Sequence, residues 1–149
     1  FNLLKTHYVR YLVWNIKDTT TDENNFNYSD DLVKADILFN GNPLITDAPE
    51  SFYNTLARYM NFKSDGTIYL GNSNGKFDGS SINNVYTYSF CLNPLSKKLS
   101  GYFTTEKFNN VGLTLHLKAS TATTRKVNIY MLKHNVLRID NGVLNLLYH

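Results

Sequence analysis

Residues 135–149, NVLRIDNGVLNLLYH, carry the clearest structural signal in the chain. Two apolar runs flank Asp140-Asn141-Gly142, and an Asn-Gly pair between such runs is typical of the tight turn of a β-hairpin. The stretch therefore predicts two closing strands, 135–139 and 143–148. Strands this apolar need cover, so the stretch also raises the question of what buries them.

Working outward, five further stretches are rich in β-branched and aromatic residues or alternate apolar with polar residues, as strands do. They are 8–16, 33–42, 85–94, 111–120 and 126–132. Between them lie an acidic surface loop, 17–31, a Gly/Asn-rich loop, 64–84, in which 67–70 could form a brief strand, and a turn-rich connection, 95–110. Leu115 and Leu137 are expected in the core. The pattern predicts a single, mostly β domain.

One segment has helical rather than strand periodicity. Asp47 is placed to cap a helix, Pro49 falls near its first turn, and Glu50 occupies the capping-box position. The apolar residues that follow recur at helical spacing and predict a buried face. They are Phe52, Leu56, Tyr59 and Met60. We expect one short helix over 48–60.

Composition excludes several classes of protein. Among 149 residues the net charge is only +3, and no run of Lys or Arg exceeds two, so the chain lacks the basic footprint of a dedicated nucleic-acid binder. The single cysteine, Cys91, excludes an internal disulfide framework. No apolar run approaches the roughly 18 residues that a transmembrane helix requires. Residue 1 is Phe rather than Met, so we expect the sequence to be part of a longer polypeptide.

The sequence predicts no catalytic residue, no cofactor site and no metal site. Residues 71–77, GNSNGKF, resemble a phosphate loop, but only three residues separate the glycines and Phe77 follows Lys76. Cys91 with His116 or His134 could be a nucleophile and base, but a lone cysteine in an apolar strand is more often a small hydrophobe. His7, His116, His134 and His149 lack zinc spacing, and Asp22, Glu23, Asp30 and Asp31 are typical of a solvated loop.

Tyr86, Tyr88 and Phe90 alternate along one strand and therefore share one face. Such an aromatic row could stack against bases or sugars. More often it is packed into a core or a subunit interface. The second interpretation is favoured, and the first is kept as the alternative.

Four stretches, in this order, resemble a known family. They are VKADILFNGN (33–42), ESFYNTLARYM (50–60), NVYTYSFCLNPLSKKLSG (84–101) and NVLRIDNGVLNLLY (135–148). They are similar to the carboxy-terminal jelly roll of the double-jelly-roll major capsid proteins of nucleocytoplasmic large DNA viruses and their virophage and Polinton-like relatives. Leu99 departs from the family's proline in the turn before Gly101, and Asp140-Asn141 replaces its common Met-Ser.

The resemblance implies an all-β viral jelly roll in which residues 1–149 form part of one domain of a longer capsid protein. It implies strands E at 8–17, F at 33–40, G at 85–92, H at 112–119 and I within 126–148, with the helix in the F–G connection. A jelly roll pairs its strands as B-I-D-G and C-H-E-F. We therefore expect strands B, C and D to lie outside this sequence, or to come from another chain, and to cover the apolar closing strands.

The resemblance also implies a structural, non-enzymatic role without cofactors. Such proteins form homotrimeric, pseudo-hexagonal capsomers that build an icosahedral shell. The implied partners are other copies, neighbouring capsomers and minor capsid or cement proteins, with no sequence-specific contact to nucleic acid and no transmembrane segment. The implied location is the virion, assembled in the host cytoplasm. The alternative is a jelly-roll carbohydrate-binding or attachment module that uses its loops with Tyr86 and Tyr88.

Overall fold

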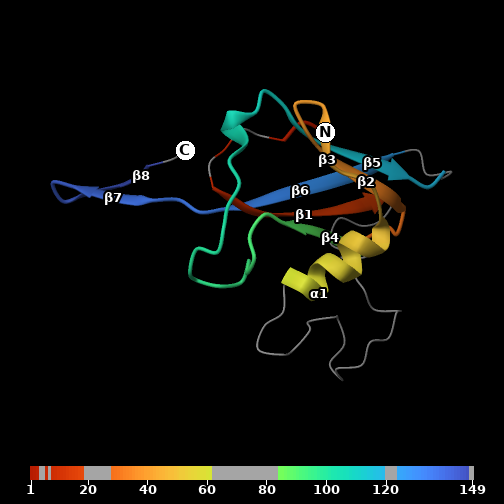
Figure 1. The fold of residues 1–149 in the computed structure, drawn as a ribbon, viewed down its shortest axis with the longest axis horizontal. Helices are drawn as coiled ribbons and strands as arrows, with labels where there is room; N and C mark the ends of the chain where they lie inside the picture. The colour runs from red at the N-terminus through yellow and green to blue at the C-terminus, as the bar shows by residue number, and fades with distance from the viewer. Residues whose placement is uncertain (4–5, 7, 19–27, 62–83, 120–123, 148–149) are drawn as a thin grey trace, which may run out of the picture.

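The computed structural model describes residues 1–3, 6, 8–18, 28–61, 84–119 and 124–147. These residues form eight strands (Figure 1). They are β1 (Val9–Asp18), β2 (Leu32–Phe39), β3 (Asn42–Pro49), β4 (Val85–Ser89), β5 (Val111–Leu117), β6 (Arg125–Lys133), β7 (Leu137–Asp140) and β8 (Val143–Leu146). A π-helical turn, η1 (Phe52–Leu56), runs into the short helix α1 (Ala57–Asn61), and a 3₁₀ turn, η2 (Thr105–Lys107), precedes β5.

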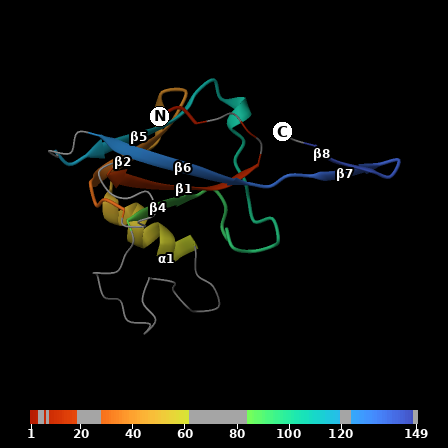
Figure 2. The ribbon, with the colours of Figure 1, turned by 180° about the vertical axis from the view of Figure 1, so that it is seen from behind.

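The body of the molecule is a sandwich of two antiparallel sheets, with strand orders β4-β1-β6 and β3-β2-β5. Figure 2 shows the same layers from behind. The core lies between them because every second side chain of β1 points inward, and Leu12, Trp14 and Ile16 are fully buried. Ala35 and Ile37 of β2 meet them from the opposite sheet. The prediction of a buried strand at 8–16 is confirmed.

The second predicted strand is the first half of a hairpin that the sequence analysis did not predict. Asn40 and Gly41, with φ of 51° and 80°, form the tight turn between β2 and β3. Asp47 therefore lies in β3, where its carboxylate pairs with Lys34. The expectation that Asp47 caps a helix is wrong.

The helical segment is present, but its buried face differs from the predicted one. The helical turns begin at Glu50 and end at Asn61. Tyr53 and Ala57, four residues apart, are buried, and they pack the segment against β4 and the core. The predicted contacts of Leu56, Tyr59 and Met60 are wrong, because these three side chains are exposed.

The strand pairing gives the first two strands different jelly-roll letters from those that were predicted. The predicted jelly roll and the position of the helix in the F–G connection agree with the structure. β1 lies between β4 and β6, which is the place of strand D between G and I. β2 lies between β3 and β5, which is the place of E between F and H. Residues 8–17 and 33–40 are therefore D and E rather than E and F, and the unpredicted β3 is strand F.

Within the described residues, one side of the sandwich is open. β4 is covered by the helical segment, whereas among the described residues β6 pairs only with β1. In the other sheet, β5 has β2 on one edge, and residues 1–3 pair with only the beginning of its other edge. There the Leu3 amide donates to Val111 O at 2.8 Å, and the Leu113 amide donates to Phe1 O at 2.9 Å. Val111 and Leu113 of β5 are buried, but five other side chains that these outer strands turn toward the core are only partly buried. They are Leu115, Leu117, Val127, Ile129 and Met131.

The predicted closing hairpin is confirmed. β7 and β8 pair in register around Asn141 and Gly142, whose φ values are 49° and 80°. Residues 136–147, here called the terminal arm, project from the end of β6 away from the sandwich (Figures 1 and 2). Leu137, expected in the core, is 54% exposed on this arm.

Candidate functional site

The described residues bring together no catalytic or metal-binding group. β4 ends at Ser89, so Cys91 follows the strand instead of lying in it, and its amide donates to the Ser89 hydroxyl at 3.2 Å. No hydrogen bond in the described part of the chain joins Cys91 to His116 or His134. His116 lies in β5 with Nε2 3.0 Å from a carboxylate oxygen of Asp36.

Several residues considered in the sequence fall outside the described residues. These are His7, His149, Asp22, Glu23 and the stretch 71–77, together with most of the Gly/Asn-rich loop 64–84. Within the described ranges, no group of three or more His, Cys, Asp or Glu side chains could hold a metal ion. In the same ranges no helix has the length and apolar character to cross a membrane.

The two described acidic loop residues make ion pairs of different kinds. Asp31 Oδ2 lies 2.9 Å from Arg125 Nε, and both side chains are less than one-fifth exposed. Asp30 Oδ2 lies 3.2 Å from Lys118 Nζ, and both of these side chains are largely solvated. Asp31 thus belongs to the body of the protein, and only Asp30 fits the expected solvated face.

A polar network covers the outer face of the β3-β2-β5 sheet. Asp36 accepts hydrogen bonds from the backbone amide of Asp47 at 2.6 Å and from the ring of His116. Burial acts to raise the pKa of Asp36, but these two partners outweigh it, so the pKa lies below its ordinary value. The Asp47 carboxylate raises the pKa of Lys34. Every member has a partner within the network, so it is a stabilising surface feature.

Of the predicted aromatic row, only Tyr86 belongs to the buried core, because Tyr88 and Phe90 are partly buried and Phe90 follows the end of β4. Tyr86 is fully buried, and its ring centroid lies 5.9 Å from that of Trp14. Burial raises the pKa of Tyr86 above its ordinary value. Tyr88 and Phe90 pack edge to face with centroids 5.1 Å apart. A buried Tyr86 cannot stack against a sugar, which removes one residue from the alternative glycan site.

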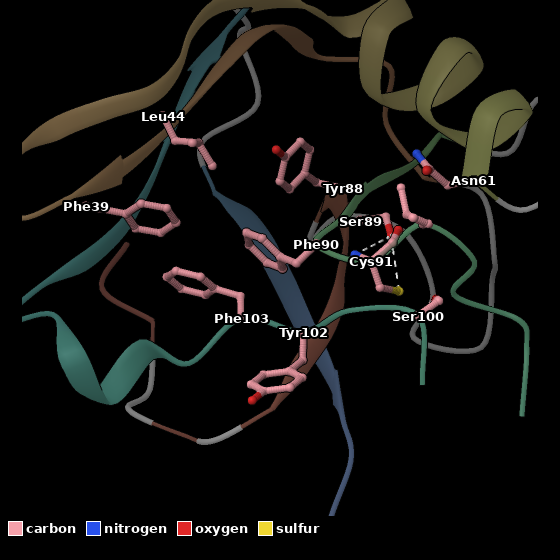
Figure 3. Close-up of a pocket in the computed structure, with 11 residues that line it drawn as sticks. Phe39, Leu44, Asn61, Tyr88, Ser89, Phe90, Cys91, Ser100, Tyr102 and Phe103 are labelled. Atoms are coloured by element: carbon pink, nitrogen blue, oxygen red, sulfur yellow. Dashed lines mark hydrogen bonds between the residues drawn. The ribbon is translucent and has the colours of Figure 1, made fainter. Parts of the chain in front are cut away.

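An apolar groove opens at one end of the sandwich, between the two sheets (Figure 3). Its volume is about 490 Å³. The walls come from the β2–β3 hairpin, the end of β4 and the segment after Gly101. The aromatic and aliphatic lining residues are Phe39, Leu44, Tyr88, Phe90, Leu92, Tyr102 and Phe103.

Stacked phenylalanines form the floor of this groove. Phe39 and Phe103 stack with centroids 4.5 Å apart, and Phe90 and Phe103 stack at 4.9 Å. Phe103 is held in place because its backbone pairs with Val9 of β1. On the rim, Leu92 is 85% exposed, and its backbone amide donates to Ser100 O at 3.3 Å. The groove offers apolar contact and little acid–base chemistry.

The sequence did not predict this groove. For the terminal arm it predicted two apolar strands that other residues must bury. The phenylalanines of the floor are separated by long stretches of sequence, and only the sheet pairing brings them together. The arm had a usable signal, because Leu137 and Ile139 alternate with charged Arg138 and Asp140. Alternation of this kind indicates a strand with two different faces. In β8, however, Val143 lies opposite Asp140 and is also exposed.

Comparisons with known proteins identify the fold. No protein-family model and no curated protein matches the sequence. Among solved structures, the quasi-atomic model of the PBCV-1 virus capsid matches with a TM-score of 0.76 and 21% identity, over 100% of this chain and 45% of that chain. PBCV-1 VP54, fitted into a reconstruction of the virophage Sputnik, matches with a TM-score of 0.75, 21% identity and the same coverage. The predicted viral jelly-roll fold is confirmed, and this chain spans less than half the length of the capsid chains it matches.

Proposed function

We propose that the chain is part of a structural capsid protein whose copies assemble into a virus shell. The observation that carries this proposal is the match of the whole chain, at a TM-score of 0.76, to 45% of a chain of the PBCV-1 capsid. The described residues add support because they form an apolar groove and a projecting arm but no catalytic cluster. Such surfaces suit permanent contacts between protein chains.

The proposal extends to the domain. Residues 1–149 are part of a jelly roll that belongs to a longer capsid polypeptide, and its B strand and most of its C strand come from other sequence. The partly exposed side chains of β5 and β6 support this, because a strand laid along each open edge would cover them. Residues 1–3 already occupy the position where a C strand would end.

The finer expectations follow from the same proposal. Copies form homotrimeric capsomers of pseudo-hexagonal outline, and these tile an icosahedral shell together with minor capsid or cement proteins. The protein is located in the virion after assembly in the host cytoplasm. It works by self-association and needs neither a cofactor nor an enzymatic activity. The carbohydrate-binding alternative loses support because Tyr86 is buried.

Electron microscopy and native mass spectrometry of the natural polypeptide that carries this sequence test the proposal. We expect trimers that associate into flat arrays or closed shells. A glycan array serves as the parallel measurement, and we expect no binding above that of an unrelated jelly roll. A protein that stays monomeric at high concentration and binds a defined glycan would overturn the proposal.

A further inference from the structure

The junction between the sandwich and the terminal arm centres on His134. β6 ends at Lys133, which lies opposite Val9 of β1. The His134 amide then donates to Tyr8 O at 2.9 Å. Beyond this bond, β7 and β8 form a two-stranded sheet of their own, and the chain leaves the sandwich (Figures 1 and 2). The direction of the arm therefore depends on how His134 is held against β1.

Tyr8 has an uncommon backbone conformation. Its φ is 51°, in the left-handed region that residues other than glycine rarely adopt. Such a conformation persists only where the surrounding structure enforces it. Two contacts contribute here, because the Tyr8 carbonyl accepts the His134 amide and the Tyr8 ring packs edge to face on Tyr102, with centroids 4.6 Å apart. Loss of the His134 bond would let Tyr8 relax, so the junction has a second conformation open to it.

The His134 ring lies where a positive charge would be costly. Its Nε2 atom is buried and has no hydrogen-bond partner in the described part of the chain. Arg10, at the irregular step in the pairing of β1 with β6, is only 8% exposed. The Arg10 guanidinium donates to Asn93 O at 3.2 Å and to Ser96 O at 2.7 Å. These acceptors are neutral carbonyls, and no described carboxylate forms an ion pair with Arg10.

Burial and the positive charge of Arg10 both lower the pKa of His134 below its ordinary value of 6.5. No carboxylate among the described residues offsets them. The other titratable side chains at this junction are Lys133, which is exposed to solvent, and the phenols of Tyr8 and Tyr102, which carry no charge at acid pH. The His134 ring is therefore neutral at pH 7.

Proton uptake by His134 should favour an open junction. An open junction exposes the ring to water and restores its ordinary pKa, so it binds a proton more readily than the closed junction does. As the pH falls below 6.5, the closed junction loses stability relative to the open one. The loss is complete once the pH lies below the pKa of His134 in the closed junction.

We infer that His134 is a pH-sensitive hinge: when its ring takes up a proton, the bond to Tyr8 opens and the terminal arm is released from the direction it has in this structure. Protonation of histidine at mildly acid pH is a common trigger of such changes. The hinge is a property of the folded polypeptide and does not rest on the capsid role.

NMR of the histidine rings in the natural polypeptide tests the electrostatic part. The His134 signal is assigned by its absence in His134→Gln, and it should titrate with a midpoint below 6.5. Arg10→Gln keeps an amide donor for the 93–96 turn and removes the charge, so the midpoint should rise. A midpoint at or above 6.5 in the unaltered protein, or one that a folded Arg10→Gln variant leaves in place, would overturn the inference.

The distance between two spin labels tests the movement. The labels are attached at Tyr130→Cys on β6 and Ile139→Cys on the arm, with Cys91→Ser, and the two sites are 58% and 70% exposed. Labelled copies are diluted with unlabelled copies, so that each distance lies within one copy. We expect one narrow distance distribution at pH 7.5 and a distribution about twofold broader at pH 5.

Two histidine variants separate the hinge from a general effect of acid. His134→Gln has no ring to protonate, so its distribution should have the same width at both pH values. The matched control is His116→Gln, in the other sheet, and it should respond as the unaltered protein does. A response that persists in His134→Gln, or no response in the unaltered protein, would overturn the inference. Either result would leave the proposed function intact, because that proposal is judged by assembly.

Discussion

Tyr53 joins the helical segment to both sheets through one buried side chain. Its hydroxyl donates to Ala35 O at 2.9 Å, and its ring meets Trp14 edge to face with centroids 5.0 Å apart. Burial raises the pKa of Tyr53, which therefore stays protonated and able to donate at neutral pH. The buried face predicted from the sequence did not include Tyr53, so its role is evident only from the structure.

Replacing Tyr53 with Phe should keep the ring and remove the donor. The Ala35 carbonyl would be left buried without its partner, at a cost of about 1–3 kcal/mol in the free energy of unfolding. Denaturant titration of the natural polypeptide measures this cost. Tyr130→Phe, at a 58% exposed position, is the control and should change stability by less than about 0.5 kcal/mol. Equal effects of the two variants would contradict the assignment of Tyr53.

Asp31 and Asp30 should differ in their effect on stability although they are adjacent. Asp31→Asn weakens a mostly buried pair and leaves Arg125 without a counter-ion, so we expect a loss of about 3 kcal/mol. Asp30→Asn removes a solvated pair and should cost less than about 1 kcal/mol. Thermal unfolding of the two variants measures the difference. A larger loss for Asp30→Asn would show that the loop packs differently.

Asp36 should make stability depend on pH in the acid range. Because its pKa in the folded protein lies below the ordinary value of 3.8, the charged form stabilises the fold above that pH. This contribution is lost as the pH falls through the lower, folded-state pKa. Asp36→Asn should therefore be less stable than the unaltered protein at pH 7, and the difference should shrink below about pH 4. Unfolding measured from pH 7 to pH 3 that shows a constant difference would rule this out.

At the scale of elements, the sequence predicted turns at both Asn-Gly pairs but a hairpin at only one of them. Asn141-Gly142 correctly predicted two paired strands, whereas the turn at Asn40-Gly41 was predicted to end a strand, and the paired strand β3 that follows it was not predicted. The helix-capping pattern of Asp47, Pro49 and Glu50 outweighed the strand signal of the residues before it. β3 has no clear alternation of buried and exposed side chains, because nearly all of its side chains are exposed, so the strand itself gave only a weak signal.

The helical segment shows a related failure. The predicted apolar face followed residue type, but the π-helical turn η1 and the position of β4 select Tyr53 and Ala57 instead. Leu56, Tyr59 and Met60 are as apolar as core residues and yet remain exposed. The small side chain of Ala57 allows close approach to β4, which hydrophobicity alone does not predict.

Enlarging Ala57 should therefore be more harmful than truncating Met60. Ala57 is 3% exposed, so Ala57→Leu forces a larger side chain against β4 and should cost about 1–3 kcal/mol. Met60 is 64% exposed, and Met60→Ala should change stability by less than about 0.5 kcal/mol. Denaturant midpoints of both variants provide the measurement. A larger loss of stability for Met60→Ala than for Ala57→Leu would support the buried face predicted from the sequence.

At the scale of the whole molecule, the sequence predicted the class of fold but not the neighbours of each strand. The β-branched and aromatic residues of 8–16 identified β1, and alternation identified β5, because burial of one face imposes it locally. The placement of β1 between β4 and β6 depends on pairing across seventy or more residues, and no local pattern encodes it. The apolar groove was unpredictable for the same reason, because Phe39, Phe90 and Phe103 meet only after both sheets form.

The open side of the sandwich leads to a prediction for residues 1–149 produced alone. Three surfaces that no described residue covers are available for association: the outer edge of β6, the part of β5 beyond its pairing with residues 1–3, and the exposed apolar side chains of the terminal arm. We expect this isolated chain to associate at micromolar concentration and to unfold over a broad temperature range.

Sedimentation velocity and circular dichroism measure the two properties. The natural polypeptide that carries the sequence is the control, and it should sediment as one defined species and unfold cooperatively. Within the isolated chain, Ile139→Lys with Leu144→Lys should reduce association only in part, because these substitutions block the arm and leave both sheet edges free. An isolated chain that is monomeric and melts in a single sharp transition would mean that the two sheets need no further strands, and the proposed incompleteness of the jelly roll would fail with it.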